Sequence, residues 1–273
     1  MNILTKTGSV LTGFAVVAFP FVALAASPNT DFETFNLGSV NTQGGWSSTG
    51  SYDQSVVANT YGFTAFGSRA LRISNAVTSG GFGDQTFSNS LLNEAGEADA
   101  LNGGKSGGVR QPHFEASFQI TSTVLDEQPG LFMSVSPDRG DGARMSYLSF
   151  EDTNKGIVVN FVEVRGTSNP AHFIEKKISK RLSRGDVHTI KFEIDFINGP
   201  SNDVVKIYID GELAHTGTSW ENYYRFDSES NPSLVSNSRT VDSLLFRTAG
   251  AAAPATLGKG FLIDNVMLSS SAN

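Results

Sequence analysis

The sequence predicts an all-β protein, a two-sheet antiparallel jelly-roll β-sandwich, from three observations. Apolar and polar residues alternate strictly over residues 188–196, which is the pattern of a strand with one buried face. Residues 204–209 alternate again and lead into Asp210-Gly211, a dipeptide typical of a tight hairpin turn. The 28 Gly among 273 residues, with Phe as the main aromatic residue, favour short strands joined by many turns. Two amphipathic strands cannot bury their apolar faces alone, so a second sheet must cover them.

A polar bend separates these two strands. Residues 198–203 include Gly199 and Pro200, which end an extended strand because Pro lacks a backbone donor and Gly favours turns. We therefore expect residues 188–196 and 204–209 to be neighbours in one sheet, with residues 213–216 as the returning strand.

The same alternation predicts strands elsewhere in the chain. Residues 80–108 are the least regular stretch, and within it residues 91–101 favour a short helix. The other expected strands are residues 52–58, 69–74, 109–120, 131–135, 144–150, 157–164, 173–178, 241–248 and 260–268.

The first 26 residues have the pattern of a signal peptide. Lys6 supplies the positive start, residues 10–24 the apolar core, and Ala23-x-Ala25 the cleavage site. The alternative is an uncleaved anchor, but this apolar core is shorter than the roughly 20 residues of a membrane span. We expect export by a bacterium, and a single jelly-roll domain over residues 27–273 that is secreted, periplasmic or at the cell surface. With no Cys, it can form no disulfide.

The charge pattern argues against nucleic acid as a partner. The net charge is -7, and basic residues cluster only at Lys176-Lys177 and Lys180-Arg181, which suit a solvated edge. No membrane span is expected after cleavage of the signal peptide, and the sequence does not specify an oligomeric state.

Three segments resemble the concanavalin A-like lectin/glucanase superfamily in its laminin-G-like form. They are HTIKFEIDF (residues 188–196), VVKIYIDGELAHTG (204–217) and GFLIDNVML (260–268). The resemblance extends over about residues 30–270. It implies a jelly roll and a polysaccharide or other glycan as partner.

The resemblance also implies one cofactor, a structural Ca²⁺. In similar modules an early F-E element and the last strand lie side by side, and each supplies a carboxylate to this hard cation. The corresponding residues here are Glu33 and Asp264. The alternative is that both acids lie on solvated strand ends.

A hydrolase site is disfavoured. Jelly-roll glucanases resemble the strand at Glu193-Ile194-Asp195, but they carry a further acid where this chain has Ile197 or Asn198. Neither side chain can protonate a leaving oxygen, so a solvated polar face is the preferred interpretation.

A polysaccharide lyase site is the favoured enzymatic alternative. Alginate lyases of this fold use an Arg-bearing strand, a Gln-x-His element and a Tyr, which resemble Arg110, His113 and Tyr147 here. The late Tyr-x-Lys motif of that family has no match, and Pro112 is unusual inside a central strand. His113 as an ordinary polar strand residue is the competing interpretation.

Aromatic and basic residues gather in a late connection and suit carbohydrate binding. Trp220, Tyr223 and Tyr224 offer flat faces for sugar rings, and Arg225 offers hydrogen bonds, with Arg144 as a further candidate ligand-binding residue. The alternative is that the rings pack over the edge of the sandwich. We therefore expect a secreted, non-catalytic glycan-recognition protein, with a polysaccharide lyase or hydrolase as the second hypothesis and a structural cell-surface or matrix protein as the third.

Overall fold

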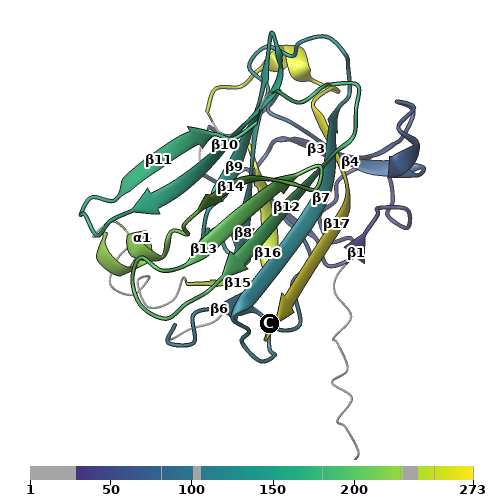
Figure 1. The fold of residues 1–273 in the computed structure, drawn as a ribbon. Helices are drawn as coiled ribbons and strands as arrows, with labels where there is room; N and C mark the ends of the chain where they lie inside the picture. The colour runs from purple at the N-terminus through teal and green to yellow at the C-terminus, as the bar shows by residue number, and fades with distance from the viewer. Residues whose placement is uncertain are drawn as a thin grey trace, which may run out of the picture.

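Two large antiparallel sheets stack as a sandwich, which confirms the predicted fold class. Figure 1 shows the fold in the computed structural model, which describes residues 29–80, 82–100, 106–179, 181–227, 229, 239–248 and 250–272. The expected signal peptide, residues 1–26, lies outside the described residues. In the part of the chain that is described, no helix has the length and apolar character needed to cross a membrane.

Sheet A contains the strands that the sequence analysis began from. Its order is β14-β13-β12-β7-β17-β4-β3, and β1 also pairs with β17. The predicted neighbours β12 and β13 pair antiparallel, from Ile190 opposite Ile209 to Asp195 opposite Val204, which confirms that prediction. The strands of this sheet are β1 (Asn29–Thr30), β3 (Asp53–Ala58), β4 (Arg69–Ser74), β7 (His113–Ser122), β12 (His188–Asp195), β13 (Val204–Ile209), β14 (Glu212–Gly217) and β17 (Phe261–Ser271).

Sheet B covers the inner face of sheet A. Its order is β11-β10-β9-β8-β16-β5-β2. The strands are β2 (Ser47–Thr49), β5 (Gln85–Phe87), β8 (Phe132–Asp138), β9 (Tyr147–Thr153), β10 (Gly156–Arg165), β11 (His172–Lys177) and β16 (Ser243–Arg247). Smaller elements are the β6 (Ala95–Gly96) and β15 (Thr240–Val241) pair, the helix α1 (Glu221–Phe226), and the 3-10 turns η1 (Thr64–Phe66) and η3 (Pro254–Thr256).

The Asp210-Gly211 dipeptide forms the hairpin that its composition predicts. Both residues have positive φ angles, 53° at Asp210 and 82° at Gly211, as a tight two-residue hairpin turn requires. This backbone conformation matches the twist of the flanking strands, so β13 leads directly into β14.

Aromatic rings from both sheets fill the space between them. Phe118 of β7 lies edge-on to Phe150 of β9 and Phe246 of β16, with ring centroids 6.0 and 5.7 Å apart. Trp46 stacks on Phe246 at 5.8 Å and is 1% exposed, as expected for a core residue. These contacts lock the two sheets face to face.

The helix expected over residues 91–101 is wrong. Instead Ala95–Gly96 forms the strand β6, which pairs with Thr240–Val241 of β15. Glu94 and Glu97 are turned inward and are 6% and 0% exposed, respectively. Tertiary partners for these buried carboxylates and for the backbone therefore override the local helix propensity.

Replacing Phe118 by Ala tests the inter-sheet core. The substitution removes a fully buried ring that touches both sheets, and we expect a loss of about 3–5 kcal/mol in the free energy of unfolding, measured by urea denaturation. Leu213→Ala is the control because Leu213 is 56% exposed, and its effect should stay within about 0.5 kcal/mol. Equal losses in both variants would contradict the assigned core.

Candidate functional site

The outer face of sheet B carries a row of polar side chains that crosses six strands. Leu148 and Phe150 of β9 belong to the core, so the alternate residues Tyr147 and Ser149 point to the outer face. The register places one polar residue of each strand side by side. This polar row consists of Gln85, Arg247, Ser134, Ser149, Asn160 and Lys177.

The polar row runs across the strands and contains both donors and acceptors, and its members Ser134, Ser149, Asn160 and Arg247 are at most 9% exposed. Asn160 Nδ2 donates to Ser149 Oγ at 3.2 Å, and the Ser149 hydroxyl lies 3.4 Å from Glu175 Oε1. Amides, hydroxyls and cations in a line can match the repeating hydroxyl and carboxylate groups of a polymer.

A cation lies beside this row between two aromatic rings. The guanidinium carbon of Arg144 is 5.9 Å from the ring centroid of Tyr147 and 5.8 Å from that of Trp220. Ring faces attract a cation through their quadrupole, which partly replaces the water lost on burial. Arg144 is 9% exposed, and no carboxylate among the described residues forms an ion pair with it. Its charge is therefore available to an external anion.

Helix α1 fixes the backbone that carries Arg144. The Tyr224 hydroxyl donates to the carbonyl of Arg144 at 2.9 Å, and the backbone N–H of Trp220 donates to the carbonyl of Met145 at 2.6 Å. The indole N–H of Trp220 donates to the carbonyl of Val162 on β10 at 2.9 Å. The sequence analysis identified this aromatic group as a carbohydrate-binding surface. In the structure Tyr224 is 5% exposed, so it holds the backbone of Arg144 and does not face a ligand.

A second arginine lies further along the row. The guanidinium carbon of Arg247 is 4.4 Å from the ring centroid of Phe82, an exposed residue in the connection before β5. Burial and the neighbouring charge of Arg144 lower the pKa of Arg247 to about 10. The two cations therefore repel each other.

Tyr147 contributes a phenol next to Arg144. Burial, followed by the charge of Glu175, raises the pKa of Tyr147 above its usual value, and the nearby arginines only partly oppose this shift. The phenol therefore keeps its proton at neutral pH. No hydrogen bond to the Tyr147 hydroxyl is formed by any described residue.

The structure does not bring Arg110, His113 and Tyr147 together. Arg110 donates to Glu94 Oε1 at 2.9 Å and to the carbonyl of Glu97 at 3.0 Å, so its guanidinium stabilises the segment around β6. His113 lies on the outer face of sheet A, with Nδ1 2.6 Å from Asp195 Oδ1. Tyr147 lies on sheet B. Arg110 precedes β7, which begins at His113, and alternation could not assign the strands of His113 and Tyr147 to different sheets.

Arg225 is occupied by buried acids and does not extend toward the polar row. Its guanidinium forms a close ion pair with Glu97, and it lies 3.7 Å from Glu221 Oε2. The residues that remain beside Arg144 are Trp220, Tyr223 and Phe173 of β11, whose rings contact one another at 4.8 to 6.1 Å.

Three buried carboxylates form a cluster that could hold a metal ion. Ligand atoms of Glu97, Asp203 and Glu221 all lie within 4.8 Å of one another, and the residues are 0–3% exposed. Two arginines already balance part of this charge, because Arg239 Nε lies 3.2 Å from Glu97 Oε1 and Arg225 also pairs with Glu97.

The two acids expected to bind Ca²⁺ lie near the paired terminal strands. Strand β1 pairs with β17 through Thr30 opposite Val266. Asp264 is 1% exposed, and burial together with the charges of Asp31 and Glu33 raises its pKa to about 8. Glu33 accepts hydrogen bonds from the backbone N–H and the hydroxyl of Ser68, which lower its pKa.

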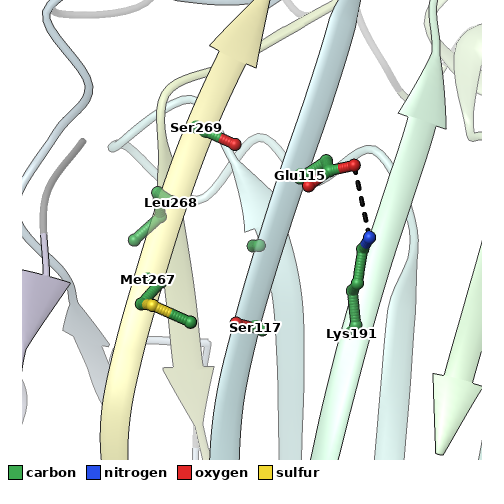
Figure 2. A pocket seen from close by; sticks show the side chains of 7 residues that line it. Glu115, Ser117, Lys191, Met267, Leu268 and Ser269 are labelled. Carbon is green, nitrogen blue, oxygen red and sulfur yellow. Dashed lines mark hydrogen bonds and ion pairs between the residues drawn. The ribbon is translucent and has the colours of Figure 1, made fainter. Parts of the chain in front are cut away.

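The outer face of sheet A differs from that of sheet B because its lysine is paired with acids of the same sheet (Figure 2). Lys191 lies 3.2 Å from Glu115, the pair joined by a dashed line in Figure 2. It also lies 2.6 Å from Glu193, so its charge is balanced within the sheet. Beside it is a hollow of about 250 Å³, lined by Ser117, Met267 and Ser269 among others. The third acid of a hydrolase is absent from this strand, because Ile197 follows Asp195 and Phe196.

Comparisons with known proteins show the fold. No protein-family model matches the sequence, and no curated protein matches it. A variant of the alginate lyase Aly36B in complex with an alginate trisaccharide is similar at a TM-score of 0.51 and 12% identity, over 89% of this chain and 97% of that chain. An endo-β-1,4-glucuronan lyase from the fungus Trichoderma reesei has a TM-score of 0.47 and 14% identity, over 87% of this chain and 95% of that chain. A sialidase has a TM-score of 0.47 and 11% identity, over 90% of this chain but only 19% of the sialidase chain.

The sequence analysis missed Arg247, Phe82 and most of the polar row. Phe246 of β16 belongs to the core, so alternation places its neighbour Arg247 on the outer face of the strand. The sequence therefore contained the signal that could have identified Arg247. The row itself depends on the register between strands far apart in the chain, which no local pattern contains.

Proposed function

We propose that this protein binds an acidic polysaccharide along the polar row on the outer face of sheet B. The observation that carries the proposal is the Arg144 guanidinium, nearly buried between Tyr147 and Trp220 without an ion-pair partner among the described residues. A desolvated cation of this kind gains most from a carboxylate, because Arg can donate two parallel hydrogen bonds to it.

The surroundings of Arg144 support a polymeric ligand. Arg247 adds a second positive charge, and Lys177 continues the row on the edge strand β11. Phe173, which is 42% exposed, and the half-buried Tyr223 supply aromatic surface against which a sugar ring can pack. The alginate lyase Aly36B has been observed with an alginate trisaccharide, and its fold is similar, although the low identity restricts that comparison to the fold.

Removing the charge of Arg144 should weaken binding of acidic glycans. We expect Arg144→Gln to reduce affinity for alginate at least about tenfold, because a charge-assisted hydrogen bond contributes roughly 1.5–3 kcal/mol. Affinity electrophoresis in gels with alginate or a neutral glucan measures the change. Lys191→Gln is the matched control, since Lys191 lies on the outer face of sheet A and should leave retention unchanged.

Two results would contradict this proposal. Equal retention by alginate and the neutral glucan would remove the role of charge, and equal loss in the Arg144 and Lys191 variants would place the ligand elsewhere. Absence of retention by any polysaccharide would favour the third hypothesis, a structural cell-surface or matrix protein.

A lyase activity is the second candidate, supported by the Tyr147 phenol, whose ring lies beside Arg144 and whose hydroxyl forms no hydrogen bond with a described residue. Elimination from a uronate breaks the C5–H and C4–O4 bonds, forms a C4=C5 double bond, passes the C5 proton to a base and delivers a proton to O4. Protonated Tyr147 suits the second transfer. His113, His188 and His215 belong to strands of sheet A, and His172 alternates with Phe173 on β11, which leaves the base unassigned.

An assay for unsaturated product separates binding from cleavage. We expect no rise in ultraviolet absorbance when the protein is incubated with alginate or glucuronan, because the raised pKa of Tyr147 opposes its action as a base. A rise in absorbance that Tyr147→Phe abolishes would contradict the non-catalytic proposal and establish a lyase activity at this site. The Tyr208→Phe variant, changed on sheet A, is the control for nonspecific effects.

We also propose that Glu33 and Asp264 take part in a structural Ca²⁺ site. Asp264 is buried next to two other acids, and no described cationic side chain forms an ion pair with it. Such a carboxylate is costly to ionise, and a hard divalent cation would relieve the repulsion. Glu33 already receives two bonds from Ser68, so Asp264 carries most of the expected effect.

Calcium should raise the melting temperature through Asp264. Ligand that binds only the folded state stabilises it, and each kcal/mol corresponds to about 2–4 °C for a domain of this size. We expect Ca²⁺ after chelation to restore a higher melting temperature in the wild type but not in Asp264→Asn. A Ca²⁺ response that survives in Asp264→Asn and disappears in Glu97→Gln would assign the ion to the buried acid cluster instead.

A further inference from the structure

A basic hollow lies where the turn between β9 and β10 meets the connection from β11 to β12. We propose that this hollow binds a doubly charged oxyanion, inorganic phosphate or a phosphate monoester, through Lys155, Arg181 and Arg184. The site is separate from the polar row, because Asn160 lies about 13 Å along the extended strand β10 from Gly156 at the turn. The proposal therefore does not rest on the proposed function.

Two segments of the chain form the basic hollow, which has a volume of about 420 Å³. Its polar lining is Lys155 and Gly156 from the turn, and Arg181, Ser183 and Arg184 from the connection. Backbone hydrogen bonds join the segments. The N–H of Leu182 donates to the carbonyl of Ile157 at 2.8 Å, and the N–H of Ile157 donates to that of Leu182 at 2.9 Å. The walls of the hollow are therefore fixed by the fold before any ligand binds.

Arg181 has a backbone conformation that residues with a side chain rarely adopt. Its φ angle is 91°, whereas such residues strongly prefer negative values. Glycine would take this conformation without strain, so stability alone does not favour an arginine here. Strained residues are concentrated at binding sites, and this one lines a hollow. The sequence suggested a solvated edge for Arg181, but β11 ends at Lys177 and Arg181 belongs to the connection beyond it.

Gly156 allows the turn to approach Arg181 closely. Its φ angle is 112°, and a Cβ at this position would lie 2.6 Å from the carbonyl oxygen of Leu182 and 3.6 Å from the Cβ of Arg181. The side chain of Arg181 therefore begins beside Gly156, the residue that follows Lys155. Backbone contacts thus bring Lys155 and Arg181 to one hollow although their charges repel each other, and an anion between them interacts favourably with both.

Positive charge exceeds negative charge among the residues of the hollow and their ion-pair partners. Lys155 and Arg181 form no ion pair with a described residue. Arg184 pairs with Asp152, whose Oδ1 lies 2.8 Å from Nε and 2.6 Å from Nη2 of the guanidinium. Asp152 Oδ2 accepts the backbone N–H of Gln128 at 3.0 Å, so both oxygens of this carboxylate are engaged. Lys155 and Arg181 are therefore left to bind an external anion.

The donors of the hollow suit a phosphate group better than a carboxylate. A phosphate monoester carries roughly −1.5 to −2 charges at pH 7 and has three acceptor oxygens. Lys155 offers an ammonium and Arg181 a planar fork of N–H groups. The Ser183 hydroxyl accepts the N–H of Gly185 at 3.1 Å and donates to no described residue, so it can donate to the ligand. A carboxylate, with a single charge and two oxygens, would leave part of this positive charge unbalanced.

The melting temperature measured with and without phosphate, at fixed ionic strength, tests this site. We expect about 20 mM phosphate to raise the wild-type value by about 2–4 °C relative to chloride, the shift for a ligand at about five times its dissociation constant. The amide NMR signals of Gly156 and Gly185 should shift in the same titration. Arg181→Gly removes both the cation and the strained conformation, so the phosphate-induced rise should disappear while the melting temperature in chloride does not fall.

Lys206→Gln is the matched control, because it removes one positive charge from β13 of sheet A and should retain the full rise. If Arg181→Gly does not fold, Lys155→Gln takes its place and should lose the rise. Glucose 6-phosphate separates the two sources of the ligand: a rise at least equal to that with phosphate assigns the site to phosphate monoesters, and a rise with phosphate alone assigns it to the free ion.

Three results would overturn the phosphate site. They are no phosphate-induced rise in the wild type, an equal rise with acetate, and equal loss of the rise in Arg181→Gly and Lys206→Gln. Retention by alginate without a response to phosphate would keep the proposed function and reject this site, whereas a phosphate response without alginate binding would do the reverse.

Discussion

The packing of two aromatic-rich inner faces is the constraint on which the rest of the molecule depends. Once Phe118, Phe150 and Phe246 interlock between the sheets, the two-residue period of a strand fixes the direction of every neighbouring side chain. Ser149 is outside because Phe150 is inside, and Arg247 is outside for the same reason beside Phe246. The polar row is therefore a geometric consequence of the core.

The outer faces of the two sheets differ in how their charges are satisfied. On sheet A, Lys191 is held between Glu115 and Glu193, and the two acids lie directly opposite each other on paired strands. Like charges opposite each other are unfavourable, so Lys191 offsets a repulsion created by the register. On sheet B, Arg144 is paired with ring faces in place of acids. Only the second arrangement leaves a cation with capacity for an external carboxylate.

Local patterns in the sequence predicted the strands and the hairpin, because alternation and turn chemistry act over a few residues. The pairing of β12 with β13 and the Asp210-Gly211 turn are examples. The predicted convergence of Arg110, His113 and Tyr147 failed because His113 and Tyr147 belong to strands of different sheets. Which sheet a strand joins is decided by packing across the whole chain. The same limit applies to residues 91–101, where partners at Thr240 and Val241 outweigh helix propensity.

Two neighbouring regions of opposite charge excess are joined by one short helix. Arg144 forms no ion pair with a described residue, while the buried carboxylates of Glu97, Asp203 and Glu221 outnumber the guanidinium groups of Arg225 and Arg239 that approach them. Isolated buried charges of either sign are costly, and each region lowers that cost by a different route. A bound anion can satisfy Arg144, and Arg225 and Arg239 partly satisfy the carboxylates. Because α1 contacts both regions through Trp220 and Arg225, this short helix fixes the position of the Arg144 site relative to the buried carboxylates.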